Sequence, residues 1–440
     1  MSNTFFIETW GCQMNDLDTQ RLSGNLKLRG WERVDDEKNA ALILLNTCSI
    51  REKSEQKVFS RLGELRELKS ERGEIRIGVA GCVAQQEGEK ILKRAPWVDF
   101  VMGPGNVGYI DEILGGKRIA TDFPEDRRYD YVSMDRPSLT KAQVTIIEGC
   151  NKNCTFCIVP TTRGREVSRP FHDVVAEVRA AVETGRVEIE LLGQTVNAYR
   201  CPVTGRDFGA LLAAVAEVAG VARLRFMTSH PAEVNDSMIA AMRDHANISR
   251  YLHLPVQSGS SRVLRRMKRL YSREKYLDTI GRIRAAIPEI HFSTDFIVGF
   301  PGETEDDFQE SISLLEEVRY GSLFAFKYSE RPGTPSLKIG PPIDDEIASE
   351  RLTRLFEVHE RIKRERLESY TGRVLPVLYE GPSRNDPSML SGRTDDNFVV
   401  NFAGDAGTPL GTIVAVRIEQ AQHHTLRGRA VDLQRGEAVA

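Results

Sequence analysis

From residue 144 onward the chain alternates six times between short apolar runs of strand length and longer segments with helical periodicity. The strand candidates are 144–148, 187–192, 223–228, 251–256, 291–298 and 323–328. Helical patterns separate them near 172–184, 208–219, 234–245, 260–286 and 304–319, and a long charged one follows near 343–370. This alternation is typical of a parallel sheet covered by helices. Six repeats, two short of a closed eightfold barrel, predict an α/β fold with a partial (β/α)6 barrel whose chemistry lies on the loops after the strands.

The regions on either side of this barrel have patterns of their own. At the N-terminus, strand-length runs at 5–10, 41–46, 75–80 and 98–102 alternate with helical patterns that begin near residues 16, 51 and 86. These predict a small parallel α/β domain. Near the C-terminus, short strands at 374–379, 398–401, 412–418 and 427–433 are separated by Gly, Asn, Asp and Pro turns, which predicts a small antiparallel β-barrel. We therefore expect domains at 1–118, 141–368 and 369–437, with a polar connector at 119–140.

Three of the seven cysteines lie in one short loop, Cys150-Asn-Lys-Asn-Cys154-Thr-Phe-Cys157, directly after the first strand of the predicted barrel. A structural zinc site usually has four protein ligands, and a 4Fe–4S cluster usually takes four cysteines. Three cysteines leave one iron open. The amine and carboxylate of S-adenosylmethionine can chelate that iron, and an electron from the cluster can then break a carbon–sulfur bond. Zinc would need a fourth ligand, and the nearest candidate, His172, lies outside the usual ligand spacing.

Three further cysteines follow three successive strands of the N-terminal domain. Cys12 comes after the first, Cys48 after the second and Cys82 after the third. Carboxyl ends of parallel strands share one edge of a sheet, so these thiols are expected to converge on one point. The alternative is three unrelated buried cysteines.

Polar residues and glycines at other strand ends are candidates for contacts with S-adenosylmethionine. Gln194 and Gln257 carry amides for polar groups, and Asp295 can accept hydrogen bonds from a ribose. Gly299 lies in an apolar loop that can flank the adenine. Phe156, inside the cysteine loop, can pack beside the adenine or merely against the loop itself.

Charge and composition exclude several classes of protein. The net charge of −3 gives no overall basic signature for nucleic acid, and the last 70 residues carry no excess of Arg and Lys. Arg163, Arg165 and Arg169 do follow the cysteine loop directly. We expect no secretory signal and no membrane segment, and hence a cytoplasmic protein whose cysteines bind metal rather than form disulfides.

The residues around Cys150, Cys154 and Cys157 resemble the radical S-adenosylmethionine (SAM) enzymes. The whole chain resembles their methylthiotransferases, which have an N-terminal domain with three cluster cysteines, a radical domain and a C-terminal RNA-binding TRAM domain. Within that family, the group that modifies isopentenyladenosine next to the tRNA anticodon is the most similar, through four motifs: Trp10-Gly11-Cys12-Gln13-Met14-Asn15, Asn46-Thr47-Cys48-Ser49-Ile50-Arg51-Glu52, Leu192-Gly193-Gln194 and Ser229-His230-Pro231.

The resemblance implies two 4Fe–4S clusters and two roles for SAM. The cluster at Cys150, Cys154 and Cys157 would generate a deoxyadenosyl radical that removes hydrogen from carbon 2 of the adenine. The auxiliary cluster at Cys12, Cys48 and Cys82 would deliver a methylated sulfur there. The implied partners are the tRNA anticodon stem-loop, an external electron donor and proteins that supply iron, sulfide and sulfur. We expect a monomer.

Other substrates and another class of protein remain open. Other members of this family act on threonylcarbamoyladenosine or on an aspartate of a ribosomal protein. The alternative of another class is a non-catalytic RNA-binding protein stabilised by a metal.

Overall fold

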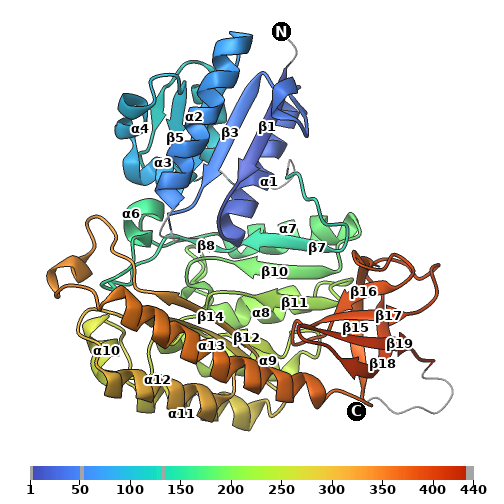
Figure 1. Ribbon diagram of the computed structural model, residues 1–440. Coiled ribbons are helices and arrows are strands. Elements are labelled where there is room, and N and C mark those ends of the chain that lie inside the picture. The colour runs from blue at the N-terminus through green and yellow to red at the C-terminus, as the bar shows by residue number, and fades with distance from the viewer. Residues whose placement is uncertain (1–2, 50–53, 126, 128, 130–133, 433–440) are drawn as a thin grey trace. The chain divides into compact units, whose positions relative to one another are not determined.

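The computed structural model describes residues 3–49, 54–125, 127, 129 and 134–432. Figure 1 labels its helices and strands. Contacts divide the chain into two compact units. The first contains Met1–Pro137, Glu148–Asn153 and Cys157–Val167, and the second contains Ser138–Ile147, Cys154–Phe156 and Ser168–Ala440. None of the described helices is long and apolar enough to cross a membrane.

The first unit is built on a six-stranded sheet with the order β2-β1-β3-β4-β5-β6, in which every pair of neighbours is parallel. The strands are β1 (Thr4–Thr9), β2 (Glu32–Arg33), β3 (Leu42–Thr47), β4 (Arg76–Gly81), β5 (Phe100–Met102) and β6 (Ile119–Ala120). The central strand β3 is buried throughout, and its apolar run at residues 42–45 is typical of a strand covered on both faces. Sequence patterns predicted the four longer strands, β1, β3, β4 and β5. They did not predict the two-residue edge strands β2 and β6, and β6 lies in the expected connector.

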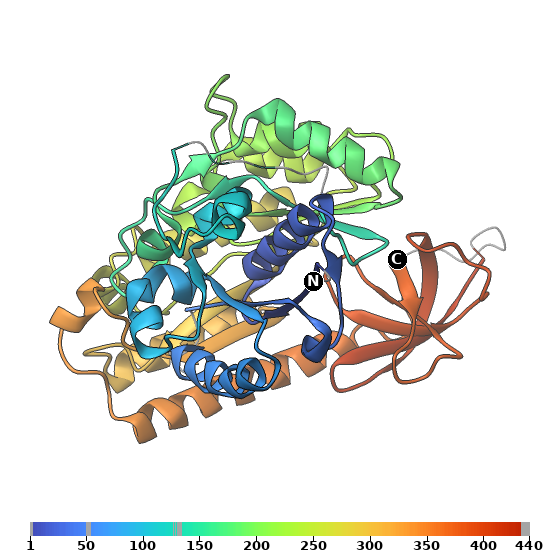
Figure 2. The same cartoon turned by 90° about the horizontal axis from the view of Figure 1, so that it is seen from above.

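Helices cover both faces of this sheet. On one face α1 (Gln13–Leu28) and α5 (Ile110–Leu114) pack through Leu22, Leu26 and Ile110 against strand residues that include Phe5 and Leu44. On the other face lie α2 (Ser54–Arg72), α3 (Cys82–Glu87) and α4 (Glu89–Arg94). The figures show α1 and α2 on opposite sides of the strands (Figures 1 and 2). The predicted start of the second helix, near residue 51, lies outside the described residues.

The second unit contains six parallel strands in two sheets of three, β11-β10-β7 and β12-β13-β14. A single bridge between Leu224 and Ile248 connects the two. The strands are β7 (Lys141–Thr145), β10 (Glu188–Leu192), β11 (Arg223–Phe226), β12 (Tyr251–His253), β13 (His291–Val298) and β14 (Ser322–Lys327). The partial (β/α)6 barrel predicted from the sequence is therefore confirmed.

Six helices supply most of the outer layer of this barrel, which shares one large apolar core with the strands. They are α7 (Phe171–Glu183), α8 (Phe208–Ala216), α9 (Asp236–Asp244), α11 (Arg273–Ala286), α12 (Glu305–Val318) and α13 (Asp345–Glu368). The helix expected at 260–286 is two helices, α10 (Ser261–Arg266) and α11. Ser272 separates them because its side chain accepts the main-chain N–H of Lys275 at 3.3 Å, as an N-cap does.

A closed five-stranded barrel follows α13 in the order β15-β16-β17-β19-β18. Its strands are β15 (Val374–Pro382), β16 (Leu390–Arg393), β17 (Val399–Ala403), β18 (Ile413–Ala421) and β19 (Thr425–Ala430). The sequence analysis missed β16. The expected all-antiparallel pairing is also wrong at one place, because β17 and β19 are parallel and this pairing closes the barrel. The predicted domain boundaries stay a prediction, and residue 437 lies outside the described residues.

Candidate functional site

Cys12, Cys48 and Cys82 lie at the carboxyl ends of β1, β3 and β4, which are neighbours in the first sheet. Cys12 is the N-cap residue of α1, Cys82 is the first residue of α3, and Cys48 comes directly after β3. The strand order reverses between β1 and β3, and open α/β sheets bind their ligands at such a switch point. The position of these cysteines in the fold is therefore that of a ligand site.

Gly11 allows the first two cysteines to approach each other. Its φ is +152°, and a Cβ at this position would lie 2.8 Å from Cys48 Cβ and 2.4 Å from Asn15 Oδ1. Asn15 in turn donates from Nδ2 to the carbonyl oxygen of Thr47 at 3.1 Å. Asn46 Nδ2 donates back to the carbonyl oxygen of Asn15 at 2.8 Å. The two motifs that contain Cys12 and Cys48 are thus joined by buried hydrogen bonds.

The electrostatic environment of these thiols favours a thiolate at Cys12. A hydrogen bond with Cys48 lowers the pKa of Cys12 to about 5, against the opposing effect of burial, and the charge of Arg163 adds to the lowering. Burial raises the pKa of Cys82, while Arg163 hydrogen-bonds to it and lowers it in part. Because thiolates are the form that ligates metals, the charge of Arg163 suits a metal site here.

Arg163, in α6 (Val159–Arg163), belongs to a buried charge network. It donates to Asp18 at 2.7 Å, and the two side chains are 5% and 2% exposed. Burial raises the pKa of Asp18 to about 6, although Arg163 and Arg21 lower it. Arg21 also pairs with Glu148 at 3.1 Å. The sequence analysis noted Arg163 as a neighbour of the cysteine loop but did not predict that it lies beside Cys12 and Cys82.

Two ends of the cysteine loop belong to the first unit. Gly149, with φ of +77°, is required because a Cβ there would lie 2.1 Å from the carbonyl oxygen of Arg165. The main-chain N–H of Cys150 donates to the carbonyl oxygen of Gly164 at 3.1 Å. The thiol of Cys150 accepts the N–H of Lys152 at 3.4 Å. Cys150 and Cys157 are partly exposed.

The middle of the loop belongs to the second unit. Arg269 donates from Nη1 to Cys154 Sγ at 3.4 Å, so a positive charge faces this thiol as well. Thr155 is anchored by its N–H to the carbonyl oxygen of Met267 at 3.0 Å. Phe156 packs against Val263, Met267 and Phe300.

The predicted cofactor-contact residues all follow or lie within strands of the second unit. Gln194 is half-buried after β10. Gln257 is buried after β12 with φ of +77°, a strained conformation for a residue that is not glycine. Asp295 is half-buried in β13. Gly299 follows β13, and its N–H already donates to Glu303 Oε2 at 2.7 Å. No described contact tests their role, so it stays a prediction.

Two residues of this region were missed by the sequence analysis. His253, in β12, contacts Ser293 Oγ through Nδ1 at 2.8 Å and Asp295 Oδ1 through Nε2 at 3.4 Å. Thr228, after β11, has φ of +68°. Alternation along β13 would have placed Ser293 and Asp295 on one face, but the register that brings His253 to them is not visible in the sequence.

The donor sets fit iron–sulfur ligation. None of the seven cysteines forms a disulfide, so all six predicted ligands keep their thiols. In the described part of the chain, only Glu360, His423 and His424 form a group of three potential ligands within 4.8 Å. Cys12, Cys48 and Cys82 do not form such a group, so at least one pair of these thiols lies more than 4.8 Å apart, which is wider than the roughly 3.8 Å that zinc–sulfur bonds of about 2.3 Å would impose. His172 is exposed and pairs with Asp173 at 3.0 Å.

Three family models match successive parts of the chain. Residues 4–103 match the model described as "Uncharacterized protein family UPF0004", and residues 144–315 match the radical SAM superfamily. Residues 368–431, which contain the closed barrel, match the TRAM domain.

Curated relatives match the chain along its length. A protein of Alkalilimnicola ehrlichii named tRNA-2-methylthio-N(6)-dimethylallyladenosine synthase is 46% identical over 100% of both chains. A protein of Clostridium tetani with the same name is 44% identical over 97% of this chain and 96% of its own.

Solved structures share the fold. The radical SAM methyltransferase TsrM of Kitasatospora setae has a TM-score of 0.55 at 14% identity, over 76% of this chain and 77% of its own. The cobalamin-dependent radical SAM enzyme OxsB has a TM-score of 0.53 at 14% identity, over 82% of this chain and 56% of its own.

Proposed function

The chain belongs to the family of the curated tRNA-2-methylthio-N(6)-dimethylallyladenosine synthases and is a radical SAM enzyme, and from this premise we propose that it modifies tRNA. The proposed reaction attaches a methylthio group to carbon 2 of isopentenyladenosine next to the anticodon. The observation that carries the proposal is the position of Cys12, Cys48 and Cys82 at three neighbouring strand ends beside a switch point. The same chain also has the separate set Cys150, Cys154 and Cys157.

Each set of three cysteines would hold one 4Fe–4S cluster. When bound, the cluster at Cys150, Cys154 and Cys157 supplies the electron for cleavage of SAM, and the cluster at Cys12, Cys48 and Cys82 supplies an iron that carries the transferred sulfur. Replacement of an aromatic C–H bond by a C–S bond calls for radical chemistry, because that hydrogen is too weakly acidic for a general base to remove.

The protein's own residues would bind, charge-balance and orient these groups. Arg163 and Arg269 place positive charge beside Cys82 and Cys154, where cluster ligation puts negative charge. Gln194, Gln257 and Asp295 would bind the polar groups of SAM, and Gly299 and Phe156 would flank its adenine. His253 would hold the Asp295 carboxylate in place for a ribose.

The proposed partners follow from this reaction. The TRAM barrel and the rest of the chain would bind the tRNA anticodon stem-loop, whose unpaired bases proteins can splay out and stack on. An external electron donor and iron–sulfur and sulfur supply proteins are required. We also propose that the enzyme acts as a monomer in the cytoplasm, where thiols stay reduced.

An anaerobic assay tests the proposal. The protein is reconstituted with iron and sulfide and then given SAM, reductant and isopentenylated tRNA, and the digested nucleosides are analysed by mass spectrometry. We expect the 2-methylthio product, and its loss when any of the six ligand cysteines becomes alanine. Cys201→Ala is the matched control, since Cys201 is also buried and outside any disulfide, but its thiol accepts the main-chain N–H groups of Phe171 and Thr204 and belongs to neither predicted ligand set.

Other outcomes assign other functions. Substantial product from a Cys82→Ala protein would contradict the role of the auxiliary cluster. Deoxyadenosine without modified tRNA would direct the search to threonylcarbamoyladenosine and to a ribosomal protein aspartate. Zinc in place of iron, with no cleavage of SAM, would support the non-catalytic RNA-binding alternative.

A further inference from the structure

A cavity of about 700 Å³ lies in the second unit between the (β/α)6 barrel and the TRAM barrel. It is at the amino ends of β11 and β13, opposite to the strand ends that carry the predicted cofactor contacts. Its walls come from the ends of α11 and α13 and from the β16–β17 turn. None of the predicted cluster ligands lines it, so it is distinct from the proposed reaction centre.

Five arginines line this cavity: Arg223, Arg250, Arg284, Arg366 and Arg373. Three carboxylates, those of Glu289, Asp395 and Asp396, line it too. The cavity therefore has an excess of positive charge, and Arg guanidinium groups are the side chains best suited to bind phosphate.

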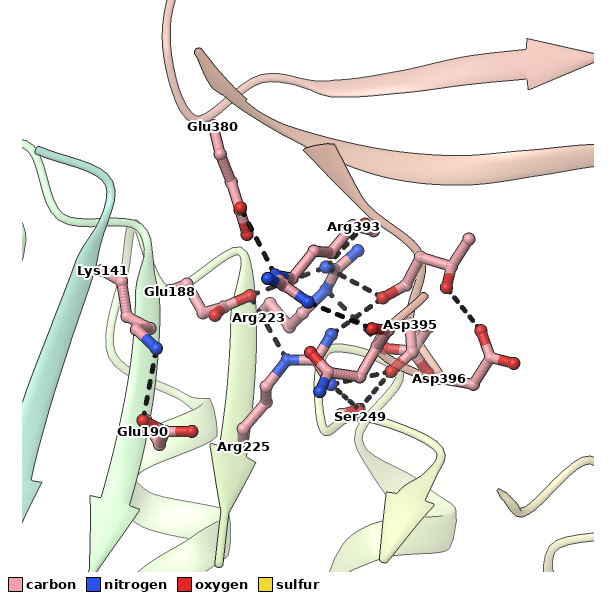
Figure 3. Close-up of polar contacts among 12 residues, drawn as sticks. Lys141, Glu188, Glu190, Arg223, Arg225, Ser249, Glu380, Arg393, Asp395 and Asp396 are labelled. Carbon is pink, nitrogen blue, oxygen red and sulfur yellow. Dashed lines mark hydrogen bonds and ion pairs between the residues drawn. The ribbon is translucent and has the colours of Figure 1, made fainter. Parts of the chain in front are cut away.

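The carboxylates do not neutralise most of these arginines. Asp395 accepts the main-chain N–H of Arg250 at 2.6 Å. It also lies 3.7 Å from Arg223 Nε (Figure 3). Asp396 accepts the hydroxyls of Thr394, at 2.5 Å, and Tyr370. Two of the three carboxylates thus accept mostly from neutral donors.

The remaining guanidinium groups contact main-chain oxygens or aromatic rings. Arg284 donates to the carbonyl oxygen of Val318 at 2.5 Å, and Arg366 donates to that of Arg319 at 3.4 Å. Arg250 donates to the carbonyl oxygen of Met242, and Arg373 lies 5.6 Å from the ring centre of Tyr370. Within the described ranges, these four guanidinium groups form no ion pair with a carboxylate.

A further observation points to an anionic ligand. Burial lowers the pKa of Arg284, and the neighbouring positive charge of Arg366 lowers it further. A bound anion in the cavity would relieve this repulsion between the two guanidinium groups.

We propose that this cavity binds a phosphodiester group of the RNA substrate, with Arg284 and Arg366 as its principal contacts. The proposal rests on the proposed function, because it takes the substrate to be RNA. The position at the edge of the TRAM barrel favours RNA over a free anion. A second anchor, away from the reaction centre, would add affinity that does not depend on the base being modified.

The test measures binding of isopentenylated tRNA to the reconstituted full-length protein over a range of salt concentrations. Arg284→Gln and Arg366→Gln should each weaken binding about tenfold at low salt. Each should also reduce the slope of log K against log salt by about one, the signature of one lost phosphate contact. Arg→Lys at each position should retain most of the salt dependence. Glu289→Gln should strengthen binding, because it removes a repelling charge from the cavity wall.

Arg282→Gln is the matched control, since Arg282 lies on the same helix, outside the cavity, and pairs with Asp236 at 2.5 Å. Unchanged thermal midpoint and iron content show that the variants are folded. If the wild type binds tRNA tightly and neither Arg284→Gln nor Arg366→Gln alters this binding, the inference is overturned and the proposed function stays intact. Wild-type protein that fails to bind tRNA overturns both. A third outcome is that inorganic phosphate binds to the wild type, that both variants abolish this binding, and that their affinity for tRNA is unaltered. This outcome identifies a free-anion site and rejects the RNA assignment.

Discussion

Arg163 places a permanent positive charge in the interior of the first unit. It donates to Asp18 at 2.7 Å and lies beside Cys12 and Cys82. An unpaired charge at such a depth is strongly unfavourable, so Arg163 and Asp18 depend on each other. One side chain therefore connects the helix after the cysteine loop with α1 and with the predicted auxiliary ligands.

Replacing Arg163 with leucine should lower the free energy of unfolding by about 3 kcal/mol, because the buried Asp18 would lose its nearest partner and keep only Arg21, at 3.8 Å. Urea denaturation of the metal-free protein measures this. The exposed neighbour Arg165 is the matched control, and Arg165→Leu should change stability by less than about 0.5 kcal/mol. The double variant Arg163→Leu/Asp18→Leu should recover part of the loss. Equal losses at Arg163 and Arg165 would show that the buried pair is not the cause.

His359, in α13, makes the second unit sensitive to acid. Burial lowers its pKa to about 4, and Lys363 contributes. In the unfolded chain a histidine has a pKa near 6.5. Below pH 6.5 the folded protein therefore binds fewer protons at this residue than the unfolded chain does. The burial of His359 has no effect on the pH dependence of the free energy of unfolding above pH 6.5. It lowers that free energy progressively as the pH falls toward 4. At pH 5.5 the cost is about 1 kcal/mol.

The free energy of unfolding, measured by urea denaturation, should fall between pH 7.5 and pH 5.5 in the wild type. We expect this fall to be smaller by about 1 kcal/mol in His359→Leu. The exposed His172 provides the control, because His172→Leu should leave the difference between the two pH values unaltered. A parallel loss in the wild type and in His359→Leu would place the acid sensitivity elsewhere.

At the scale of elements, local signals decided which predictions held. Strand β13 has the predicted bounds, because its alternation is clear and it is buried. The expected strand at 251–256 ends at His253, since Pro255 has no N–H and Gln257 takes a positive φ. Strand β16 was missed because Leu390-Ser-Gly-Arg393 has no strand periodicity of its own and is held by its neighbours β15 and β17.

The N-cap of α11 provides a test at this scale. Ser272→Ala should destabilise the second unit by about 1 kcal/mol, because the first turn of α11 loses its acceptor for the N–H of Lys275. Hydrogen exchange of the first turn of α11 should accelerate. Ser313 is exposed in the middle of α12. Ser313→Ala removes only the hydrogen bond from its hydroxyl to the carbonyl oxygen of Glu310 and should have little effect. Unchanged exchange in Ser272→Ala would show that tertiary packing alone fixes where α11 begins.

At the scale of the whole molecule, long-range contacts are what the sequence leaves out. The positions of all six predicted ligand cysteines follow from strand ends, a local pattern. In contrast, Arg223 and Arg225 of β11 reach across about 170 residues to the β16–β17 turn. Both also approach Glu188, at 3.5 Å and 3.4 Å (Figure 3). No periodicity or composition signals this buried network, which joins the TRAM barrel to the (β/α)6 barrel.

Asp395→Ala should loosen that junction. The change leaves the main-chain contacts of residue 395 in place but removes the acceptor for the N–H of Arg250, at 2.6 Å, and one counter-charge of Arg223. The expected loss of stability is about 2 kcal/mol, and hydrogen exchange in β16 and β17 should accelerate more than in β10 and β13. Asp405→Ala, in an exposed turn of the same barrel that bonds only within itself, should leave this exchange unaltered. The Asp395 side chain is one-third exposed, but Arg223 and Glu188 are buried, so added salt should reproduce only a small part of the effect of Asp395→Ala. If salt reproduced the whole effect, the junction would depend on exposed charges rather than on the buried side chains that Asp395 contacts.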